Sequence, residues 1–216
     1  MTQADNTPAG EPAALTPGAA AAREAIADSS AVLAAVARDW AGWVDEVATE
    51  LTRRLRAGHK LLTCGNGGSA ADAQHIVTEL AGMFYIKDRE PLPAMALTTN
   101  TSVLTSVGND FGYDEVFARQ VGSVGQPGDV LFAISTSGGA RSVRRAVEEA
   151  TRRGLWTVGF TGAKGAEFAA MCDTAIVVPS ADVARIQEAH ICVGHSICGL
   201  VERAIAGLPV SARAPL

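Results

Sequence analysis

The sequence predicts a single α/β domain in which a parallel sheet is covered by helices on both faces. Short, nearly continuous apolar runs alternate with helical patterns from residue 60 onward. Buried parallel strands joined by helical crossovers produce this alternation. The length of 216 residues suits one domain, and 48% hydrophobic against 19% charged residues allows a large core.

Five strands and six connecting or closing helices are expected from the periodicity of the apolar residues. The strands are predicted at residues 60–64, 93–98, 129–134, 156–160 and 174–178. The helices are predicted at 69–83, 101–107, 115–121, 141–153, 166–171 and 184–206. Ligands of such sheets bind at the carboxyl ends of the strands, so the loops that follow the strands are the candidate site.

The segments outside this α/β region, which spans residues 59–208, have a different character. Residues 1–19 are rich in Ala, Pro, Thr and Gly and are expected to form a flexible tail, and 209–216 form a short second tail. Residues 20–58 predict two helices, one over 22–40 and one whose apolar residues run from Trp43 to Leu55. The apolar stripes of these helices must pack on the domain or on a second copy of the chain.

Composition argues against several classes of protein. A net charge of −5 and a pI near 5.4 lack the basic excess of nucleic-acid binders. No apolar run reaches the length of about 20 residues that a membrane helix needs, and the first residues do not resemble a signal peptide. The four cysteines lack zinc-site spacing, so we expect buried free thiols in a reducing compartment, the cytoplasm.

Two glycine-rich or hydroxyl-rich loops join a strand to a helix. The first reads Gly65-Asn66-Gly67-Gly68-Ser69 and the second Ser135-Thr136-Ser137-Gly138-Gly139. Glycines let the backbone approach a ligand, and a helix N-terminus favours an anion. Ser69 is expected to cap the first of these helices, with Asp72 completing a capping box. Each loop alone is compatible with a structural turn, but the two together favour a phosphorylated ligand.

A dinucleotide site is the main rival for the first loop. Gly65, Gly67 and Ala70 satisfy the G-x-G-x-x-G/A fingerprint. That fingerprint also requires an acidic residue at the end of the next strand, where this chain has Thr98-Thr99-Asn100. There is no Walker lysine either. We therefore expect no nucleotide cofactor and rank a sugar phosphate above a nicotinamide or a flavin.

Polar residues recur at helical spacing on two of the predicted helices. His75 and Glu79 are four residues apart and share one helix face, while Gln187 and His195 lie in one row of the closing helix. If these helices meet, within one subunit or across a boundary, the four side chains suit zinc with an open position or acid–base chemistry. The alternative is a hydrogen-bonded i,i+4 pair and a separate core histidine.

In order, these segments resemble the sugar isomerase (SIS) domain, most closely its phosphoheptose isomerase branch. The resemblance rests on the two loops, on Asp72-Ala-Gln-His75 with Glu79, on Gly108-Asn109-Asp110-Phe111-Gly112-Tyr113, and on Arg185-Ile186-Gln187-Glu188-x-His190-x4-His195. It covers residues 20–206. It implies a flavodoxin-like sheet of five parallel strands and a homotetramer with active sites at subunit interfaces, assembled with the help of the N-terminal helices.

The resemblance also implies a reaction and roles for individual residues. Sedoheptulose 7-phosphate would be converted to D-glycero-D-manno-heptose 7-phosphate through an enediol, with Glu79 as the base and His195 as its acid/base partner. Zinc would be bound by His75, Glu79, Gln187 and His195. The substrate and its phosphate would be held by Asn66, Gly67, Ser69, Asn109, Asp110, Ser135, Thr136, Ser137 and Gln187.

Two departures from the branch bear on the choice of sugar. Where the branch commonly has a further serine in the second loop, this chain has Ala140, followed by Arg141, whose charge is a candidate replacement. After the glutamate the branch often has Gly-Arg, and here the pair is Gly82-Met83. Two alternatives follow: an isomerase or epimerase of another sugar phosphate in a secondary-metabolite pathway, and a non-catalytic protein of the DiaA type that binds a replication initiator. Glu79 and His195 argue against the second alternative.

Overall fold

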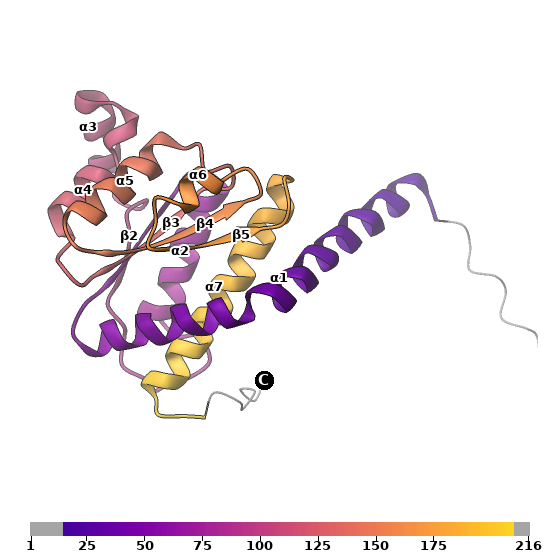
Figure 1. Cartoon of the computed structure of the whole chain (residues 1–216), viewed down its shortest axis with the longest axis horizontal. Helices are drawn as coiled ribbons and strands as arrows, with labels where there is room; N and C mark the ends of the chain where they lie inside the picture. The colour runs from indigo at the N-terminus through magenta and orange to yellow at the C-terminus, as the bar shows by residue number, and fades with distance from the viewer. Residues whose placement is uncertain (1–14, 210–216) are drawn as a thin grey trace, which may run out of the picture.

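A parallel sheet of five strands forms the centre of the molecule, as predicted (Figure 1). The computed structural model describes residues 15–209. The strands are β1 (Leu61–Gly65), β2 (Ala94–Ala96), β3 (Val130–Ile134), β4 (Trp156–Gly162) and β5 (Thr174–Val178). They lie in the order β2-β1-β3-β4-β5, the flavodoxin-like order, and all neighbours are parallel. The chain changes direction across the sheet between β1 and β3, so a ligand is expected at the carboxyl ends of these two strands.

Helices cover both faces of the sheet and create two cores. One face carries α1 (Pro17–Arg56), α2 (Gly68–Ala81) and α7 (Val183–Ile205). The other carries α3 (Thr101–Phe111), α4 (Ala118–Val124), α5 (Arg141–Arg152) and the short α6 (Ala166–Ala169). A single 3-10 turn, η1 (Tyr113–Glu115), joins α3 to α4. The strands are buried on both sides, which explains their nearly continuous apolar sequences.

The prediction of two N-terminal helices is wrong, because Pro17–Arg56 is one helix of 40 residues. The only break in the pattern is Gly42, and one glycine costs a helix about 1 kcal/mol relative to alanine, too little to end it. The start is fixed by Pro17 in the first turn and by Thr16, whose Oγ1 accepts the N–H of Ala19 at 3.2 Å. Residues 17–19, expected in the flexible tail, are therefore helical. The rest of that prediction, residues 1–14, lies outside the described residues, as do residues 210–216.

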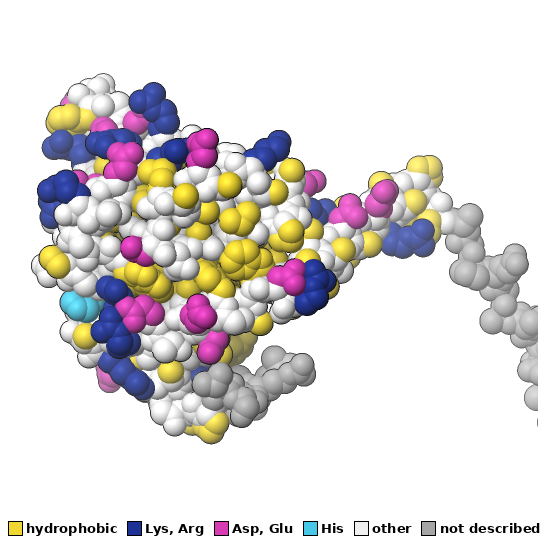
Figure 2. All heavy atoms as spheres, viewed as in Figure 1, with side chains coloured by type: hydrophobic (Ala, Val, Ile, Leu, Met, Phe, Trp, Pro, Cys, Tyr) yellow, Lys and Arg dark blue, Asp and Glu magenta, His cyan; other side chains and the backbone are white. Residues whose placement is uncertain are grey.

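The two halves of α1 have different surroundings. The C-terminal half packs along α7 and buries Val44, Val47 and Leu51. The N-terminal half extends away from the body of the domain (Figure 1), and Ile26 on this half is 68% exposed. Figure 2 shows that apolar side chains are also visible over the β5 edge of the sheet, where alternate residues of the strand are only partly buried. The projecting half of α1 thus has apolar surface that the other described residues, up to residue 209, do not cover.

The expected capping box at the start of α2 does not form. The N-cap is Gly67, with φ of 55°, and no side chain caps the helix. Ser69 therefore lies inside the first turn, where it is buried, and Asp72 falls beyond the position that a capping partner needs. The positive φ of Gly67 shortens the turn and exposes its backbone N–H groups, which a capping side chain would otherwise occupy.

Two predictions from composition can be compared with the structure. Cys64 and Cys198 are buried free thiols as expected, but Cys172 is half-buried and Cys192 is exposed. Among residues 15–209, no helix combines the length and the apolar character needed to cross a membrane.

Candidate active site

The two predicted phosphate-type loops lie side by side at the carboxyl ends of β1 and β3. Gly65, the last residue of β1, pairs with Ile134, the last residue of β3. The first loop is tied to the start of α5, the helix that follows the second loop, by a hydrogen bond in which Asn66 Nδ2 donates to Ser142 Oγ at 3.0 Å. The loops therefore form one surface at the point where parallel α/β sheets bind ligands.

Asn66 is held from a second side by a residue that the sequence did not single out for this role. The hydroxyl of Tyr113, in η1, donates to Asn66 Oδ1 at 2.8 Å. The amide therefore has a fixed orientation, with its oxygen toward Tyr113 and its nitrogen toward Ser142. Tyr113 directly follows Gly112, which has φ of 90°, so the glycine in the Gly-Tyr pair was the available signal.

The second loop places its hydroxyls without help from the neighbouring arginine. Ser135 is buried at the strand end, and Ser137 Oγ accepts the N–H of Gly139 at 3.2 Å. Ala140 is the N-cap of α5 and provides no side-chain cap. Arg141 is paired with Asp114, Nε to Oδ2 at 3.0 Å, with 79% of its side chain exposed. This pairing directs the charge of Arg141 to Asp114, so nothing in the loop replaces the hydroxyl that Ala140 lacks.

His75, Glu79 and His195 form a compact cluster on the facing sides of α2 and α7. His75 Nε2 lies 3.0 Å from Glu79 Oε1 and 3.2 Å from His195 Nε2. One candidate ligand atom from each residue lies within 4.8 Å of the others. A tetrahedral metal with bonds of about 2.0–2.1 Å separates its ligand atoms by roughly 3.4 Å. Two imidazole nitrogens and a carboxylate oxygen at these separations fit such an ion.

The surroundings of this cluster alter its ionisation. Burial and the neighbouring His75 both lower the pKa of His195, while the charge of Glu79 opposes them. One helical turn before His75, burial raises the pKa of Asp72 to about 6, and His75 partly offsets that rise. A lowered pKa keeps the His195 imidazole neutral near pH 7, which both metal binding and proton acceptance require.

Gln187 occupies a different place from the other three predicted metal ligands. Its amide lies against Gly68 at the start of α2, where a Cβ would come within 2.3 Å of Gln187 Nε2. Eight residues separate it from His195, or about 12 Å along α7. Within one subunit the structure therefore brings together His75, Glu79 and His195, and it places Gln187 beside the glycine-rich turn.

Asn109 and Asp110 lie near the end of α3, on the side of the sheet opposite α2. Both are exposed, and Asn109 Nδ2 donates to Asp110 Oδ1 at 2.7 Å. No hydrogen bond or ion pair among the described residues joins them to the histidine cluster or to either loop.

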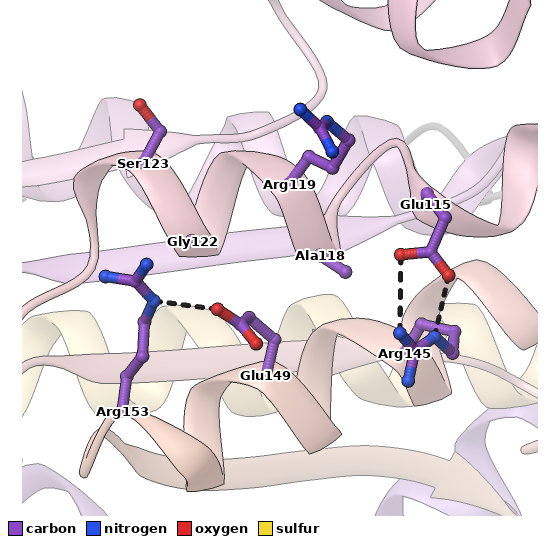
Figure 3. Close-up of a pocket in the computed structure, with 8 residues that line it drawn as sticks. All are labelled: Glu115, Ala118, Arg119, Gly122, Ser123, Arg145, Glu149 and Arg153. Carbon is purple, nitrogen blue, oxygen red and sulfur yellow. Dashed lines mark hydrogen bonds and ion pairs between the residues drawn. The ribbon is translucent and has the colours of Figure 1, made fainter. Parts of the chain in front are cut away.

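A second hollow, of about 430 Å³, lies between α4 and α5 (Figure 3). Two of its three arginines are paired: Arg145 Nε lies 2.8 Å from Glu115 Oε1, and Arg153 Nε lies 2.7 Å from Glu149 Oε1. The third, Arg119, has its guanidinium over the ring of Phe111, 3.7 Å from the centroid. None of the predicted site residues lines it. Because two carboxylates hold two of its arginines and none of the predicted site residues lines this hollow, the strand-end loops remain the candidate site.

Comparison with known proteins agrees with this geometry. Residues 26–162 match the SIS domain family model. The chain is 55% identical over 167 residues to a phosphoheptose isomerase from Rhodospirillum rubrum, covering 77% of this chain and 88% of that protein. It is 49% identical over 162 residues to one from Aneurinibacillus thermoaerophilus, covering 75% and 81%.

Solved structures give the same result. The phosphoheptose isomerase of Neisseria gonorrhoeae superposes with a TM-score of 0.80 at 39% identity, covering 85% of this chain and 97% of that one. A phosphoheptose isomerase from Francisella tularensis gives 0.84 at 31% identity, covering 87% and 100%. The chain belongs to the SIS domain family and, within it, to the phosphoheptose isomerases.

Proposed function

We propose that this protein is an aldose–ketose isomerase that converts sedoheptulose 7-phosphate to D-glycero-D-manno-heptose 7-phosphate. The observation that carries the proposal is the cluster of His75, Glu79 and His195, because the first two lie on α2, a helix that begins at a glycine-rich turn suited to an anion. One end of the helix suits a phosphate, and the cluster, about 10 Å further along, suits proton transfer. A seven-carbon sugar phosphate has its carbonyl near one end and its phosphate at the other. It could therefore reach the turn with its phosphate and the cluster with its carbonyl.

Proton transfer is assigned to Glu79 and His195. Glu79 removes a proton from C1 of the ketose while His195 gives one to the oxygen on C2, which yields the enediol. Glu79 then returns a proton to C2, and His195 accepts the proton from the oxygen on C1, which leaves the aldehyde. A lowered pKa makes the protonated form of His195 a stronger acid, which favours its donation of a proton to the oxygen on C2.

The substrate is held by the two loops and by polar residues around them. The backbone of Gly67 and the side chains of Asn66 and Ser69 are offered on one side. The hydroxyls of Ser135, Thr136 and Ser137 are offered on the other. Gln187, packed against the turn, is close enough to contact the sugar, and Asn109 and Asp110 are assigned to the more exposed part of the site.

Zinc is the metal that the cluster suits best, with His75, Glu79 and His195 as ligands. Zinc would supply a Lewis acid that polarises the carbonyl oxygen of the sugar. The fourth ligand in the family resemblance, Gln187, lies too far along α7 to join its own subunit's cluster. It would come from Gln187 of the partner subunit, consistent with sites at subunit interfaces.

Assembly into a homotetramer is supported by the surface of α1. Its N-terminal half projects from the domain with Ile26 exposed, and exposed apolar surface of this kind is usually covered by a partner. We place the protein in the cytoplasm, since all four of its cysteines are free thiols, as expected in a reducing compartment.

Another sugar phosphate is the second candidate substrate. Met83 lies just beyond α2 and is 53% exposed, at a position where the phosphoheptose isomerase branch often has arginine. Ala140 lacks the hydroxyl that the branch commonly has at its position. Both changes remove polar contacts without altering the histidine cluster. They favour a sugar with fewer polar contacts at these two positions, and a panel of C5 to C7 ketose phosphates tests this candidate.

The proposed reaction is tested by incubating the protein with sedoheptulose 7-phosphate in D₂O. We expect the aldose 7-phosphate to form, with deuterium at C2. Glu79→Gln should lower kcat by about 10²–10⁴-fold, the usual contribution of a general base. Glu148→Gln, an exposed carboxylate paired with Arg145 on α5, is the matched control and should keep full activity. If neither product nor deuterium appears with the unaltered protein, the proposal is wrong, and binding to a replication initiator becomes the hypothesis to test.

A further inference from the structure

The segment between α2 and β2, residues 82–93, is tied to α7 by a buried ion pair. Arg89 Nε lies 2.7 Å from Glu202 Oε1, and the two side chains are 3% and 0% exposed. Removing a charge from water is costly, so a pair this buried requires further hydrogen bonds to persist. Both residues have them.

Glu202 also holds the start of the segment. Its carboxylate accepts the backbone N–H of Phe84 at 3.2 Å and that of Tyr85 at 2.8 Å. Burial alone would raise the pKa of this carboxyl, but the hydrogen bonds from the backbone and from Arg89 outweigh burial and lower it. Glu202 is therefore a charged anchor for two consecutive residues of the segment.

Arg89 connects the same anchor to the end of α2. Its Nη1 donates to the backbone oxygen of Leu80 at 2.7 Å, and its Nη2 donates to the backbone oxygen of Glu79. The last carbonyls of a helix have no partner within the helix, so Arg89 caps the turn that carries Glu79.

Phe84 links this anchored segment to His195. Its ring stacks on the imidazole with centroids 5.4 Å apart and an interplanar angle of 21°. His75 meets the same imidazole edge-on, at 4.7 Å and 78°. The ring of Phe84 also lies beside Gly199, one turn beyond His195 on α7, where an added Cβ would be 3.5 Å from Phe84 Cε1, an ordinary van der Waals contact. His195 is thus held between Phe84 on its face and His75 at its edge.

We propose that Arg89 and Glu202 are positioning residues for the isomerase reaction: they hold Phe84 against His195 and fix the turn of α2 that carries Glu79. The inference rests on the proposed function for its effect on turnover, but the geometry can be tested without turnover. Arg89 touches Glu79 only at its backbone oxygen, and Glu202 bonds to Arg89 and to backbone N–H groups of the segment, so both act through Phe84 and the end of α2. Loss of the pair should lower kcat and leave KM nearly unchanged.

The test replaces Glu202 by glutamine, which keeps the shape and one acceptor for the backbone N–H groups but removes the charge. The control is Asp129→Asn, because Asp129 is also buried, accepts two backbone N–H groups and pairs with Lys60 Nζ at 2.5 Å. Asp129 lies before β3, at the end of the sheet opposite the candidate site. Each protein is labelled with ¹³C at histidine Cε1, and the His195 signal is assigned with a His195→Asn variant.

We expect Glu202→Gln to move the His195 signal, because the ring current of Phe84 changes when the segment shifts. It should also lower kcat about tenfold with KM within about twofold, the range expected for groups that orient a functional residue. Asp129→Asn should leave both unchanged. If Glu202→Gln does not fold, Arg89→Lys makes the same test, because it keeps the positive charge beside Glu202 but removes the guanidinium that bonds to the backbone oxygens of Glu79 and Leu80.

An unmoved His195 signal overturns the proposal, and so does a moved signal with unaltered kcat. If the unaltered protein does not isomerise sedoheptulose 7-phosphate, the proposed function fails. The NMR measurement then still decides whether the ion pair holds His195, because it needs no substrate.

Discussion

The Nε2 atoms of His75 and His195 lie 3.2 Å apart although 120 residues separate them in the chain. Two imidazole nitrogens at this distance share a proton or face a common cation. Glu79, one turn beyond His75, lies against the same nitrogen of His75 and provides a negative charge at that point. A cation is the partner that satisfies all three groups together, which leads to the first prediction.

Purified protein should bind about one zinc ion per subunit. His75→Ala or His195→Ala should each weaken zinc binding by more than about 100-fold. Loss of a residue that only hydrogen-bonds to a metal ligand costs about 10–100-fold in affinity, and loss of a ligand itself should cost more. His59→Ala is the control, since His59 lies before β1 and is absent from the cluster. Metal content after dialysis and competition with a chelating dye give the affinity. Zinc binding that survives the loss of both clustered histidines would place the metal elsewhere.

Gln187→Ala separates the two roles assigned to that residue. If Gln187 of the partner subunit is a ligand, the variant should weaken zinc binding in the assembled protein. If Gln187 acts only beside Gly68, zinc binding should remain and KM should rise. Measuring both quantities on one preparation distinguishes these results.

Much of the fold could be predicted because each local pattern agreed with the tertiary structure. The strands are buried on both faces, so their apolar runs were visible without knowledge of their neighbours. His75 and Glu79 are four residues apart, and this local spacing alone was enough to place them on one face of α2. The prediction of two N-terminal helices missed the length of α1, because the two apolar patterns belong to one helix that continues through Gly42.

Long-range pairing was the part that the sequence could not predict. Arg89 and Glu202 are 113 residues apart, and neither lies in a pattern that identifies the other. The meeting of His75 with His195 was conditional on two helices packing together, and only the structure places them in contact. Gln187 was assigned to the cluster from its helical row with His195 and from the family resemblance, although its spacing from His195 already implied a separation of about 12 Å along a helix.

Gly65→Ala should destabilise the first loop and weaken substrate binding. A Cβ at Gly65 would lie 2.5 Å from the backbone oxygen of Ser69, which no side-chain rotation can relieve. We expect the free energy of unfolding to fall by about 1–3 kcal/mol, as for other overpacked sites, and KM to rise.

The matched control is Gly42→Ala in α1, where a Cβ meets nothing within 4 Å. That variant should raise the free energy of unfolding by about 1 kcal/mol. Urea titration measures both, and equal stability of the two variants would contradict the tight-turn interpretation.

His190 should make the stability of the protein depend on pH between about 4 and 6.5. Its side chain is fully buried, and its Nε2 lies 3.3 Å from the backbone oxygen of Thr161. Burial lowers the pKa of His190 to about 4, and the contact with Thr161 opposes the shift. In the unfolded chain the pKa is about 6.5.

The sign of this effect follows from proton uptake. Above pH 6.5 the imidazole is neutral in both states, and its contribution to stability is complete. As the pH falls toward 4, only the unfolded chain gains the proton, so the free energy of unfolding decreases by up to roughly 3 kcal/mol.

Asp72, whose pKa burial raises to about 6, changes the stability with pH in the opposite direction over the same range, so wild-type data alone would mix the two contributions. The informative quantity is therefore the difference between wild type and His190→Gln in urea titrations at fixed protein concentration. That difference should change by this amount between pH 7 and pH 4, and a constant difference would show that His190 is not buried in its neutral form.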